Sequence, residues 1–316
     1  MLSAQWRGLS AVIVLLGPNG QLGWELRRAL APLGEVVALG RTRQSDGNCA
    51  DLADSIALTD TLRALRPEVV VNAAAYTAVD KAESEPGLAH AVNADAPGLI
   101  ARQMAEWGGW LLHFSTDYVF DGSGTHARTE DEAPAPLCTY GRSKLAGEQA
   151  IRASGCQHLI LRTSWLHAAR GGNFARTMLQ LATERDALRV VDDQIGSPTG
   201  ADWLADVAAH ALRMAMSNGL LGGTYHACAG GYTSWCDYAR HVVAWGRAVG
   251  LPLRTTPESV AGIPTSEFPS AAQRPLNSRL DTLKLRRSFG LASPQWQDGV
   301  DRMLIEALPS FLNGTR

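Results

Sequence analysis

The chain has 316 residues, of which 46% are hydrophobic and 19% charged, the composition of an ordinary globular protein with a substantial core. A formal net charge of -2 gives no electrostatic reason to expect nucleic acid or an anionic membrane as a partner. The five cysteines are too sparse for a disulfide scaffold and lack the spacing of a zinc site, so they suit a reducing cytoplasm.

The N-terminal stretch MLSAQWRGLSAVIVLLG combines an early arginine with an apolar run, which raises the question of a signal peptide. The run is too short, has no small-residue cleavage site after it, and leads directly into a glycine turn, as a buried strand would. No stretch reaches the ~20 apolar residues of a membrane span. We therefore expect a cytoplasmic protein.

Short apolar runs alternate with longer amphipathic segments through the first half of the chain. The runs predict buried strands, and the segments between them have helical periodicity. This alternation is typical of a Rossmann-type α/β fold, a doubly wound parallel sheet with helices on both faces. The expected strands are 11–16, 35–39, 68–74, 110–115 and 158–164, and the expected helices are 21–31, 56–65, 88–106 and 140–153.

The pattern loosens after about residue 170. A proline-rich stretch at 255–279 predicts a long irregular segment, which in a compact domain is usually functional or disordered. We expect residues 1–170 to form the Rossmann domain and residues 171–316 to form mainly a smaller, looser C-terminal substrate lobe, with part of the later chain returning to the sheet. Helices are expected at 173–184, 201–216, 234–248, 282–289 and 296–307.

Three glycines, Gly17, Gly20 and Gly23, follow the first expected strand and lead into the first helix. Glycine lets the backbone turn sharply and approach a pyrophosphate, whose charge the helix N-terminus stabilises. The spacing G-x-x-G-x-x-G is that of the short-chain dehydrogenase variant of this loop. It predicts a dinucleotide cofactor, with contacts from Gly17, Asn19, Gly20, Gln21 and Leu22.

The end of the second expected strand bears on the choice of cofactor. An acidic residue there would favour a free 2′-hydroxyl, but Gly40 stands at that position, followed by Arg41 and Arg43. Guanidinium groups suit a 2′-phosphate, so we predict NADPH, with NADH also possible. Further expected contacts are Asp51 and Leu52 beside the adenine, and the small residues Ala73, Ala74 and Ala75 beside the cofactor backbone.

Tyr140 and Lys144 stand four residues apart at the start of an expected helix. Side chains at this spacing share one helix face and can converge on one ligand. A neighbouring ammonium lowers the pKa of a phenol from about 10 and makes it a usable proton donor or acceptor. A surface helix yields such a pair by chance too, so the prediction depends on the other motifs.

A Ser115-Thr116-Asp117 sequence ends the fourth expected strand, at the edge where open α/β sheets bind ligands. A simple Ser/Thr turn would explain these residues taken alone. Together with the glycine loop, Tyr140 and Lys144, their order is that of a complete reductase. We predict that the Thr116 hydroxyl hydrogen-bonds a substrate carbonyl beside Tyr140.

Longer stretches carry a family resemblance between about residues 11 and 303. They are GQLGWEL, VNAAAYTAVDKAESEP, STDYVFDG, YGRSKLAGE, RTSWL, GGNFARTML, DDQIGSPTGA and QRPLNSRLDT. These motifs resemble the extended short-chain dehydrogenase/reductase family and, within it, the dTDP-4-dehydrorhamnose reductases. The resemblance implies reduction of the 4-keto group of dTDP-4-dehydro-L-rhamnose to dTDP-L-rhamnose, a step of L-rhamnose biosynthesis for cell-surface polysaccharide.

The resemblance also implies roles for single residues. Tyr140 would donate the proton, Lys144 would bind the nicotinamide ribose and lower the tyrosine pKa, and Thr116 would contact the reacting oxygen. The implied substrate contacts are Thr116, Asp117, Trp165, Arg274 and Asn277, with Ser278 adjacent. From the residues alone, a buried core side chain is the preferred explanation of Trp165. The alternative for the Arg274 segment is a solvated loop with a turn at Pro275.

Some relatives dimerise through a magnesium ion held by glutamates. Glu25, Asp202 and Glu306 fall near the matching positions, but one of them is an aspartate and all three suit a helix surface. We therefore assign no metal, and Mg²⁺ and a homodimer remain open expectations.

Two alternative functions share these motifs. An NAD-retaining sugar-nucleotide epimerase has the same fold, tyrosine and lysine, but consumes no NADPH on net turnover. A non-catalytic NADP-binding regulatory subunit would bind the cofactor without turnover, and intact Thr116, Tyr140 and Lys144 argue against it.

Overall fold

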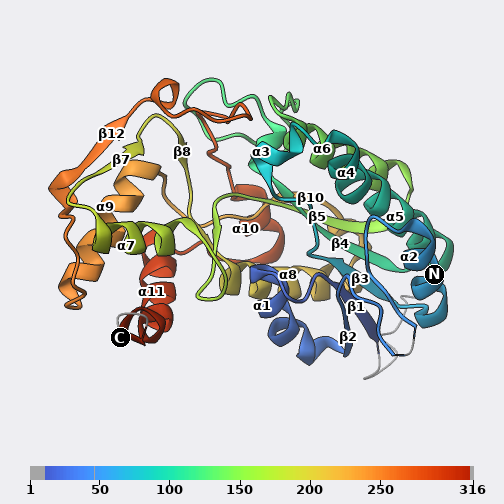
Figure 1. The fold of residues 1–316 in the computed structure, drawn as a ribbon. Helices are drawn as coiled ribbons and strands as arrows, with labels where there is room; N and C mark the ends of the chain where they lie inside the picture. Colours follow the sequence, from blue (N-terminus) through green and yellow to red (C-terminus); the bar gives the residue numbers. More distant parts are fainter. Residues whose placement is uncertain (1–10, 46, 314–316) are drawn as a thin grey trace.

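A six-stranded parallel sheet is the centre of the computed structural model, which describes residues 11–45 and 47–313 (Figure 1). The first ten residues of the N-terminal stretch lie outside this range. The strand order β10-β5-β4-β3-β1-β2 confirms the expected doubly wound α/β fold. The strands are β1 (Val12–Leu16), β2 (Glu35–Leu39), β3 (Val69–Asn72), β4 (Trp110–Thr116), β5 (Gln157–Thr163) and β10 (Gly223–His226).

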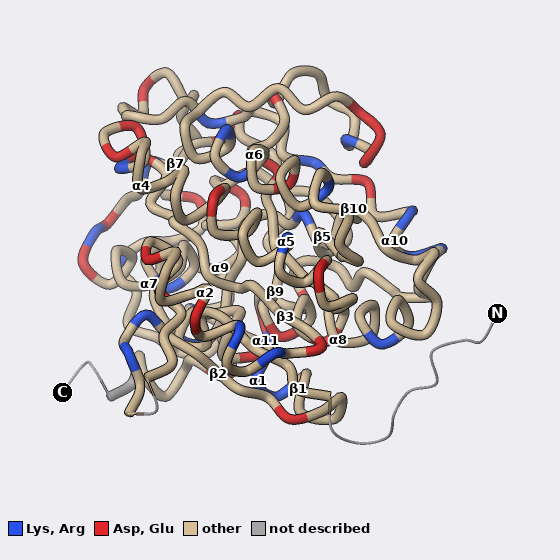
Figure 2. The backbone as a smooth tube through the Cα atoms, turned by 90° about the vertical axis from the view of Figure 1, so that its right-hand side faces the viewer, with Lys and Arg blue, Asp and Glu red and all other residues tan. Residues whose placement is uncertain are grey.

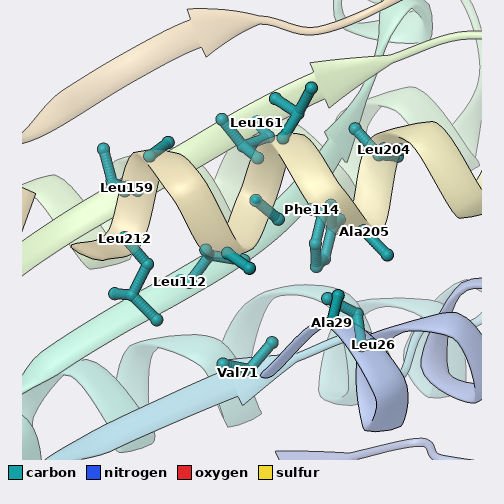
Figure 3. Packing of buried hydrophobic residues seen from close by; sticks show 14 of the residues in the cluster. Leu26, Ala29, Val71, Leu112, Phe114, Leu159, Leu161, Leu204, Ala205 and Leu212 are labelled. Carbon is teal, nitrogen blue, oxygen red and sulfur yellow. The ribbon is translucent and has the colours of Figure 1, made fainter. Parts of the chain in front are cut away.

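Helices cover both faces of this sheet. Alternate strand residues point to opposite faces, so Leu15 and Val71 pack with one helix layer, whereas Val14 and Val70 pack with the other. The first layer is α1 (Gln21–Leu30) and α8 (Ala201–Ser217); the second includes α2 (Ser55–Leu65), α5 (Ala96–Trp107) and α6 (Thr139–Ala153). Figure 3 shows α8 lying on the leucines of the sheet, each fully buried leucine contributing roughly 1.5–3 kcal/mol.

The expected helix 88–106 has a more complex form. It consists of α4 (Pro86–His90), a π-helical turn at Ala91–Asp95 and α5. The turn contains Asn93, whose side chain hydrogen-bonds the backbone of Tyr76 and the hydroxyl of Ser143. These bonds tie the turn to the helix that carries Tyr140, in keeping with the frequent placement of π-turns near functional sites.

A second, smaller core lies beside the sheet, on the left in Figure 1. Its helices are α7 (Phe174–Glu184), α9 (Trp235–Ala248) and α11 (Trp296–Asn313), joined by the strand pair β7 (Leu188–Val191) and β12 (Val260–Ile263). Strand β12 falls within the segment 255–279 expected to be irregular; its pairing with β7 was not visible in the sequence. Helix α8 packs on the large sheet and β10 belongs to it, although both follow residue 170 in the chain. The expected division into two domains at residue 170 stays a prediction.

Smaller elements complete the fold. Helix α10 (Leu283–Phe289) and α3 (Val79–Ala82) are short, and two strand pairs join β6 (Leu166–His167) to β9 (Thr199–Gly200) and β8 (Ile195–Gly196) to β11 (Thr233–Ser234).

Charged residues of both signs are interspersed along the backbone in Figure 2. In the part of the chain that the structure describes, no helix combines the length and apolar character needed to cross a bilayer.

Candidate active site

The glycine loop between β1 and α1 has the geometry of an anion cradle. Gly17 adopts a φ of 79°, and a Cβ on Gly23 would stand 2.0 Å from the Gly17 carbonyl oxygen, so side chains are excluded at both positions. Helix α1 begins after Gly20 with no side-chain cap and no acidic residue in its first turn. Its first N–H groups are therefore available to a pyrophosphate, and the loop fits a dinucleotide.

A basic cavity of about 350 Å³ adjoins this loop, and Asn19 lines both it and the main cavity. Its walls include Gly40, Arg41 and Arg43, as expected for a site that receives a 2′-phosphate. Arg43 also donates to the carbonyl oxygen of Gly47 at 2.8 Å.

The two expected adenine contacts, Asp51 and Leu52, do not line either cavity among the described residues. Leu52 is buried in the core beneath the sheet, and Asp51 accepts a hydrogen bond from the backbone N–H of Ala53.

A main cavity of about 690 Å³ opens at the carboxyl edge of β1, β3, β4 and β5 and collects most of the expected site residues. From the cofactor set it contains Gly17, Asn19, Gly20, Gln21, Leu22, Ala73, Ala74 and Ala75; from the reaction and substrate sets it contains Thr116, Asp117, Tyr140, Lys144 and Trp165. It is also lined by Tyr118 and Trp235, to which the sequence analysis gives no role: Tyr118 lies within the STDYVFDG motif, and Trp235 lies in none of the motifs.

Tyr140 is held at the start of α6 by a close backbone approach. A Cβ on Gly141 would lie 2.2 Å from the carbonyl oxygen of Tyr118, so only glycine allows the helix to sit there. The Tyr140 ring packs edge-on against Tyr118, and its hydroxyl interacts with Thr116. Burial raises the pKa of Tyr140 above its ordinary value, and the charge of Asp117 adds to this, which keeps the phenol protonated at neutral pH.

Lys144 lies one helical turn beyond Tyr140 and is fully buried. Its Nζ donates to the carbonyl oxygen of Phe114 at 2.6 Å and lies 3.1 Å from Nε2 of His113. Burial lowers the pKa of Lys144 to about 8, with a partial offset from the charge of Glu148. In this geometry burial dominates the pKa of Tyr140 and the lysine protons face β4, so the lowering of the tyrosine pKa by Lys144 stays a prediction.

Asp117 is a buried carboxylate at the cavity wall. One oxygen accepts from the Thr116 hydroxyl at 3.1 Å, and the other has no hydrogen-bond partner among the described residues. Burial raises the pKa of Asp117 to about 6, although the hydroxyls of Ser278 and Thr116 offset part of the shift. An acceptor left unpaired in this way suits a substrate hydroxyl.

Trp165 lies on the lobe side of the cavity in a strained conformation. Its φ is 46°, rare for a bulky residue, and its ring stacks on Trp235 with centroids 3.6 Å apart. A Cβ on Gly196 would approach the Trp165 ring to 2.6 Å, so glycine at that position leaves room for the indole. Both rings are partly exposed to the cavity, as expected for an apolar face that meets a sugar.

Arg274 and Asn277 occupy supporting positions outside the cavity walls. Arg274 forms a two-pronged ion pair with Asp80 at 2.6 and 3.1 Å and also interacts with Tyr118. Asn277 donates to the carbonyl oxygens of Ser123 and His126. The structure does not bring either side chain to the cavity surface, so their contact with substrate stays a prediction.

The three carboxylates considered for a metal belong to α1, α8 and α11. Burial raises the pKa of Glu25, and the charges of Asp202 and Glu306 contribute to the shift. Asp202 is also 3.3 Å from the guanidinium of Arg302. Across residues 11–45 and 47–313 no group of three or more His, Cys, Asp or Glu side chains is arranged to hold a metal ion.

The fold and this cavity define the class of the protein. A glycine cradle, a basic cavity beyond it, and a half-buried tyrosine and a buried lysine beside a strand-end threonine are the parts of a nicotinamide-dependent oxidoreductase with the short-chain dehydrogenase/reductase architecture.

Comparisons with known proteins narrow this class to one family. The family model described as the RmlD substrate binding domain matches residues 11–308. The dTDP-4-dehydrorhamnose reductase of Salmonella typhimurium is 50% identical over 294 residues, 93% of this chain and 97% of that protein, and the Escherichia coli (strain K12) enzyme is 49% identical over the same shares. The crystal structure of dTDP-4-dehydrorhamnose reductase from Bacillus anthracis in complex with NADP is 33% identical, has a TM-score of 0.83, and covers 94% of this chain and 100% of that one. The chain belongs to the dTDP-4-dehydrorhamnose reductase family.

Proposed function

We propose that the protein reduces the 4-keto group of dTDP-4-dehydro-L-rhamnose with NADPH and gives dTDP-L-rhamnose. The observation that carries the proposal is the convergence of Thr116, Tyr140 and Lys144 with the glycine cradle in one cavity. Family membership over almost the whole chain supports the same substrate.

The nicotinamide, when bound, supplies the hydride to the sugar carbon. The residues of the chain supply the proton and position the reacting groups. Tyr140, kept protonated by burial, donates its proton to the oxygen that gains negative charge, and Thr116 orients that oxygen beside the phenol. Lys144, charged below a pH of about 8, binds the ribose hydroxyls and favours the phenolate left behind.

The remaining substrate contacts are assigned by position. Asp117 offers an unpaired carboxylate oxygen to a sugar hydroxyl, and Trp165 offers an apolar face supported by Trp235. We assign Arg274, which Asp80 holds beside the cavity residue Tyr118, to the diphosphate of the nucleotide, because a guanidinium pairs with phosphate through charge-assisted hydrogen bonds.

The cofactor preference and cellular setting are further parts of the proposal. Arg41 and Arg43 beside the glycine cradle support NADPH over NADH. We assign the enzyme to the cytoplasm, a reducing compartment that suits its free cysteines, and we predict a homodimer that size-exclusion chromatography with light scattering would reveal. We assign no Mg²⁺, because the described residues offer no group of ligands for it.

A direct assay tests the function against its two alternatives. Purified protein with dTDP-4-dehydro-L-rhamnose should oxidise one NADPH per keto sugar reduced, whereas an epimerase would oxidise none on net turnover. The Tyr140→Phe variant should lose about 10²- to 10⁴-fold in turnover while binding NADPH within about twofold of wild type. No NADPH oxidation by the wild type would favour one of the two alternatives, with conversion of the sugar nucleotide to an epimer indicating the epimerase and no conversion indicating the regulatory subunit. Full turnover by Tyr140→Phe would refute the assignment of the proton donor.

A further inference from the structure

The short helix α3 follows strand β3 and presents two carboxylates on one face. Asp80 lies within the helix and Glu83 ends it, and side chains three residues apart share a helix face. Asp80 accepts two hydrogen bonds from Arg274, at 2.6 and 3.1 Å, and one from the backbone N–H of Ala272 at 3.1 Å. Glu83 bonds to a different part of the site, the start of α6.

Glu83 holds the residue that precedes the proposed proton donor. Its Oε1 accepts the backbone N–H of Thr139 at 2.7 Å, and its Oε2 accepts the Thr139 hydroxyl at 2.9 Å. Thr139 is the first residue of α6, and Tyr140 follows it directly. The guanidinium of Arg142 donates to the same threonine oxygen at 2.9 Å. Both carboxylate oxygens of Glu83 are therefore bonded to the first turn of the helix that carries Tyr140.

The cap that α6 supplies for itself is weak. The first N–H groups of a helix lack partners one turn earlier and need an outside acceptor. The N-cap residue, Cys138, accepts the Gly141 N–H at 3.5 Å through its sulfur, a weak acceptor. Burial raises the pKa of the Cys138 thiol, so this cap carries no charge. The carboxylate of Glu83 supplies the negative charge that stabilises a helix N-terminus.

The position of Glu83 is fixed by the helix that it ends. Ala82, directly before it, is fully buried, and its N–H donates to the carbonyl oxygen of Ala78 at 2.9 Å. The Glu83 side chain is half-buried, and Val79 in the same helix lines the main cavity. A carboxylate placed in this way sets the position of Thr139 relative to the cavity wall.

The position of this first turn matters because Tyr140 lies in it. The Tyr140 hydroxyl interacts with Thr116 at the end of β4, beside the place that the proposed function gives to the reacting oxygen. Helix ends fray, and a reacting group displaced by about 1 Å can cost about 10²-fold in rate. We propose that Glu83 is a positioning residue for the reaction, whose contact with Thr139 holds the Tyr140 hydroxyl at the reacting oxygen. This inference rests on the proposed function, since it needs Tyr140 as the proton donor.

Steady-state kinetics of two variants test the proposal. Glu83→Ala removes both acceptors, so kcat should fall about 10- to 100-fold, while KM for the keto sugar and the Kd for NADPH stay within about twofold. Glu83→Gln keeps a side chain of the same length that can accept the Thr139 N–H and contact its hydroxyl, so its kcat should return to within about threefold of wild type. All rates are measured where circular dichroism shows each variant fully folded. A purely structural role would lower the unfolding free energy of Glu83→Ala and leave its kcat unchanged, which would overturn the proposal.

The Tyr140→Phe background shows whether Glu83 acts through the tyrosine. Once the proton donor is absent, its position no longer affects the rate. Adding Glu83→Ala to Tyr140→Phe should therefore change the residual turnover by less than about twofold. A similar loss in both backgrounds would overturn the proposal, because Glu83 would then act on another part of the site.

Glu85→Ala is the matched control for loss of a carboxylate from the same segment. Glu85 accepts a hydrogen bond from the Tyr76 hydroxyl at 2.7 Å and pairs with Lys81 at 2.8 Å. Its removal makes the same change in charge and leaves the contact between Glu83 and Thr139 in place. The kcat of Glu85→Ala should stay within about twofold of wild type.

Amide hydrogen exchange tests the contact without turnover. Peptides covering residues 138–145 should exchange about fivefold faster in Glu83→Ala than in wild type, the scale of a lost helix cap, and at the wild-type rate in Glu85→Ala. Equal exchange in wild type and Glu83→Ala would overturn the proposal. If the wild type oxidises no NADPH, the proposed function fails, and the exchange rates still decide whether Glu83 holds the turn that carries Tyr140.

Discussion

The Nζ of Lys144 lies 3.1 Å from Nε2 of His113, and both side chains are buried beneath the active-site cavity. Burial, followed by the charge of Lys144, holds the pKa of His113 well below its ordinary value, so the imidazole is neutral. Its Nδ1 lies 3.2 Å from the side-chain amide of Asn72 on the neighbouring strand. The sheet thus holds the lysine head group through β4 and fixes its distance from Tyr140.

The low pKa of Lys144 predicts a descending limb in the pH profile. Its folded pKa of about 8 lies below the ordinary 10.5, so the charge that binds the ribose is present below about pH 8 and is lost as pH rises through it. The value of kcat/KM should therefore fall above about pH 8, because this ratio reports the free enzyme. Lys144→Arg, charged throughout, should be slower but lack the limb. The same limb in Lys144→Arg would assign it to another group.

Five strands of the sheet were predictable because their signals are local, whereas β10 was not among the expected strands. The runs at 11–16, 35–39 and 110–115 are apolar and short, and each is followed by turn residues or a helix with a clear periodicity. Strands β7 and β12 could not be predicted, because each is four residues long and exists only through its pairing with the other across 68 intervening residues.

The cavity was predictable on its cofactor side and less so on its lobe side. The glycine cradle and the spacing of Tyr140 and Lys144 have chemical signatures within a few residues of sequence. Trp235 has none, since it lies on α9 in the lobe and reaches the cavity only through the long-range packing of the chain. The direction of the tyrosine pKa was also out of reach, because burial is a property of the folded chain.

The raised pKa of Asp117 predicts that replacing its carboxylate stabilises the fold at neutral pH and weakens sugar binding. Its folded pKa of about 6 lies above the ordinary 3.8, so this group reduces stability as pH rises from about 4 to 6, and the loss persists at higher pH. The Asp117→Asn side chain does not ionise. Urea titrations would give the difference in unfolding free energy between the variant and the wild type, and this difference should shift by roughly 1 kcal/mol in favour of the variant between pH 5 and pH 8. Its KM for the keto sugar should rise. A pH-independent difference would contradict the raised pKa.

The basic cavity predicts how cofactor preference can be changed. Arg41→Ala removes a guanidinium from the wall that would meet a 2′-phosphate, so the Kd for NADPH should rise by about 10- to 100-fold, while the Kd for NADH stays within about twofold. Arg63→Ala, an exposed change on α2, serves as the control for general loss of positive charge. Parallel weakening of both cofactors in Arg41→Ala would mean that the arginine contacts a part common to the two.

The close approach of Gly196 to Trp165 predicts a substitution that weakens sugar binding and leaves cofactor binding unchanged. A methyl group there would meet the Trp165 ring at 2.6 Å and push the indole out of its stack on Trp235. Gly196→Ala should raise KM for the keto sugar roughly tenfold, the scale of a displaced apolar contact, with little change in the Kd for NADPH. Gly87→Ala, with open space around its Cβ, is the matched control. An unchanged sugar KM would remove Trp165 from the substrate site.

Glu148 affects both the stability of the fold and the pKa of Lys144. Its carboxylate receives two hydrogen bonds from Arg162, at 2.7 and 2.9 Å, and both side chains are buried. Burial alone would raise the pKa of Glu148, but the hydrogen bonds and charge of Arg162 outweigh it and hold the pKa below its ordinary value. Glu148→Gln leaves the guanidinium of Arg162 buried and without a counter-charge, so the unfolding free energy should fall by about 3–5 kcal/mol. The exposed control Glu106→Gln should leave the unfolding free energy almost unchanged.

The same substitution should move the pH profile. Glu148 raises the pKa of Lys144, partly opposing the effect of burial, so its neutral replacement lets that pKa fall below about 8. The descending limb of kcat/KM in Glu148→Gln should shift to lower pH, measured at a temperature where circular dichroism shows the variant fully folded. A destabilised variant with an unshifted limb would mean that Glu148 supports only the fold, and that the lysine charge is set by burial alone.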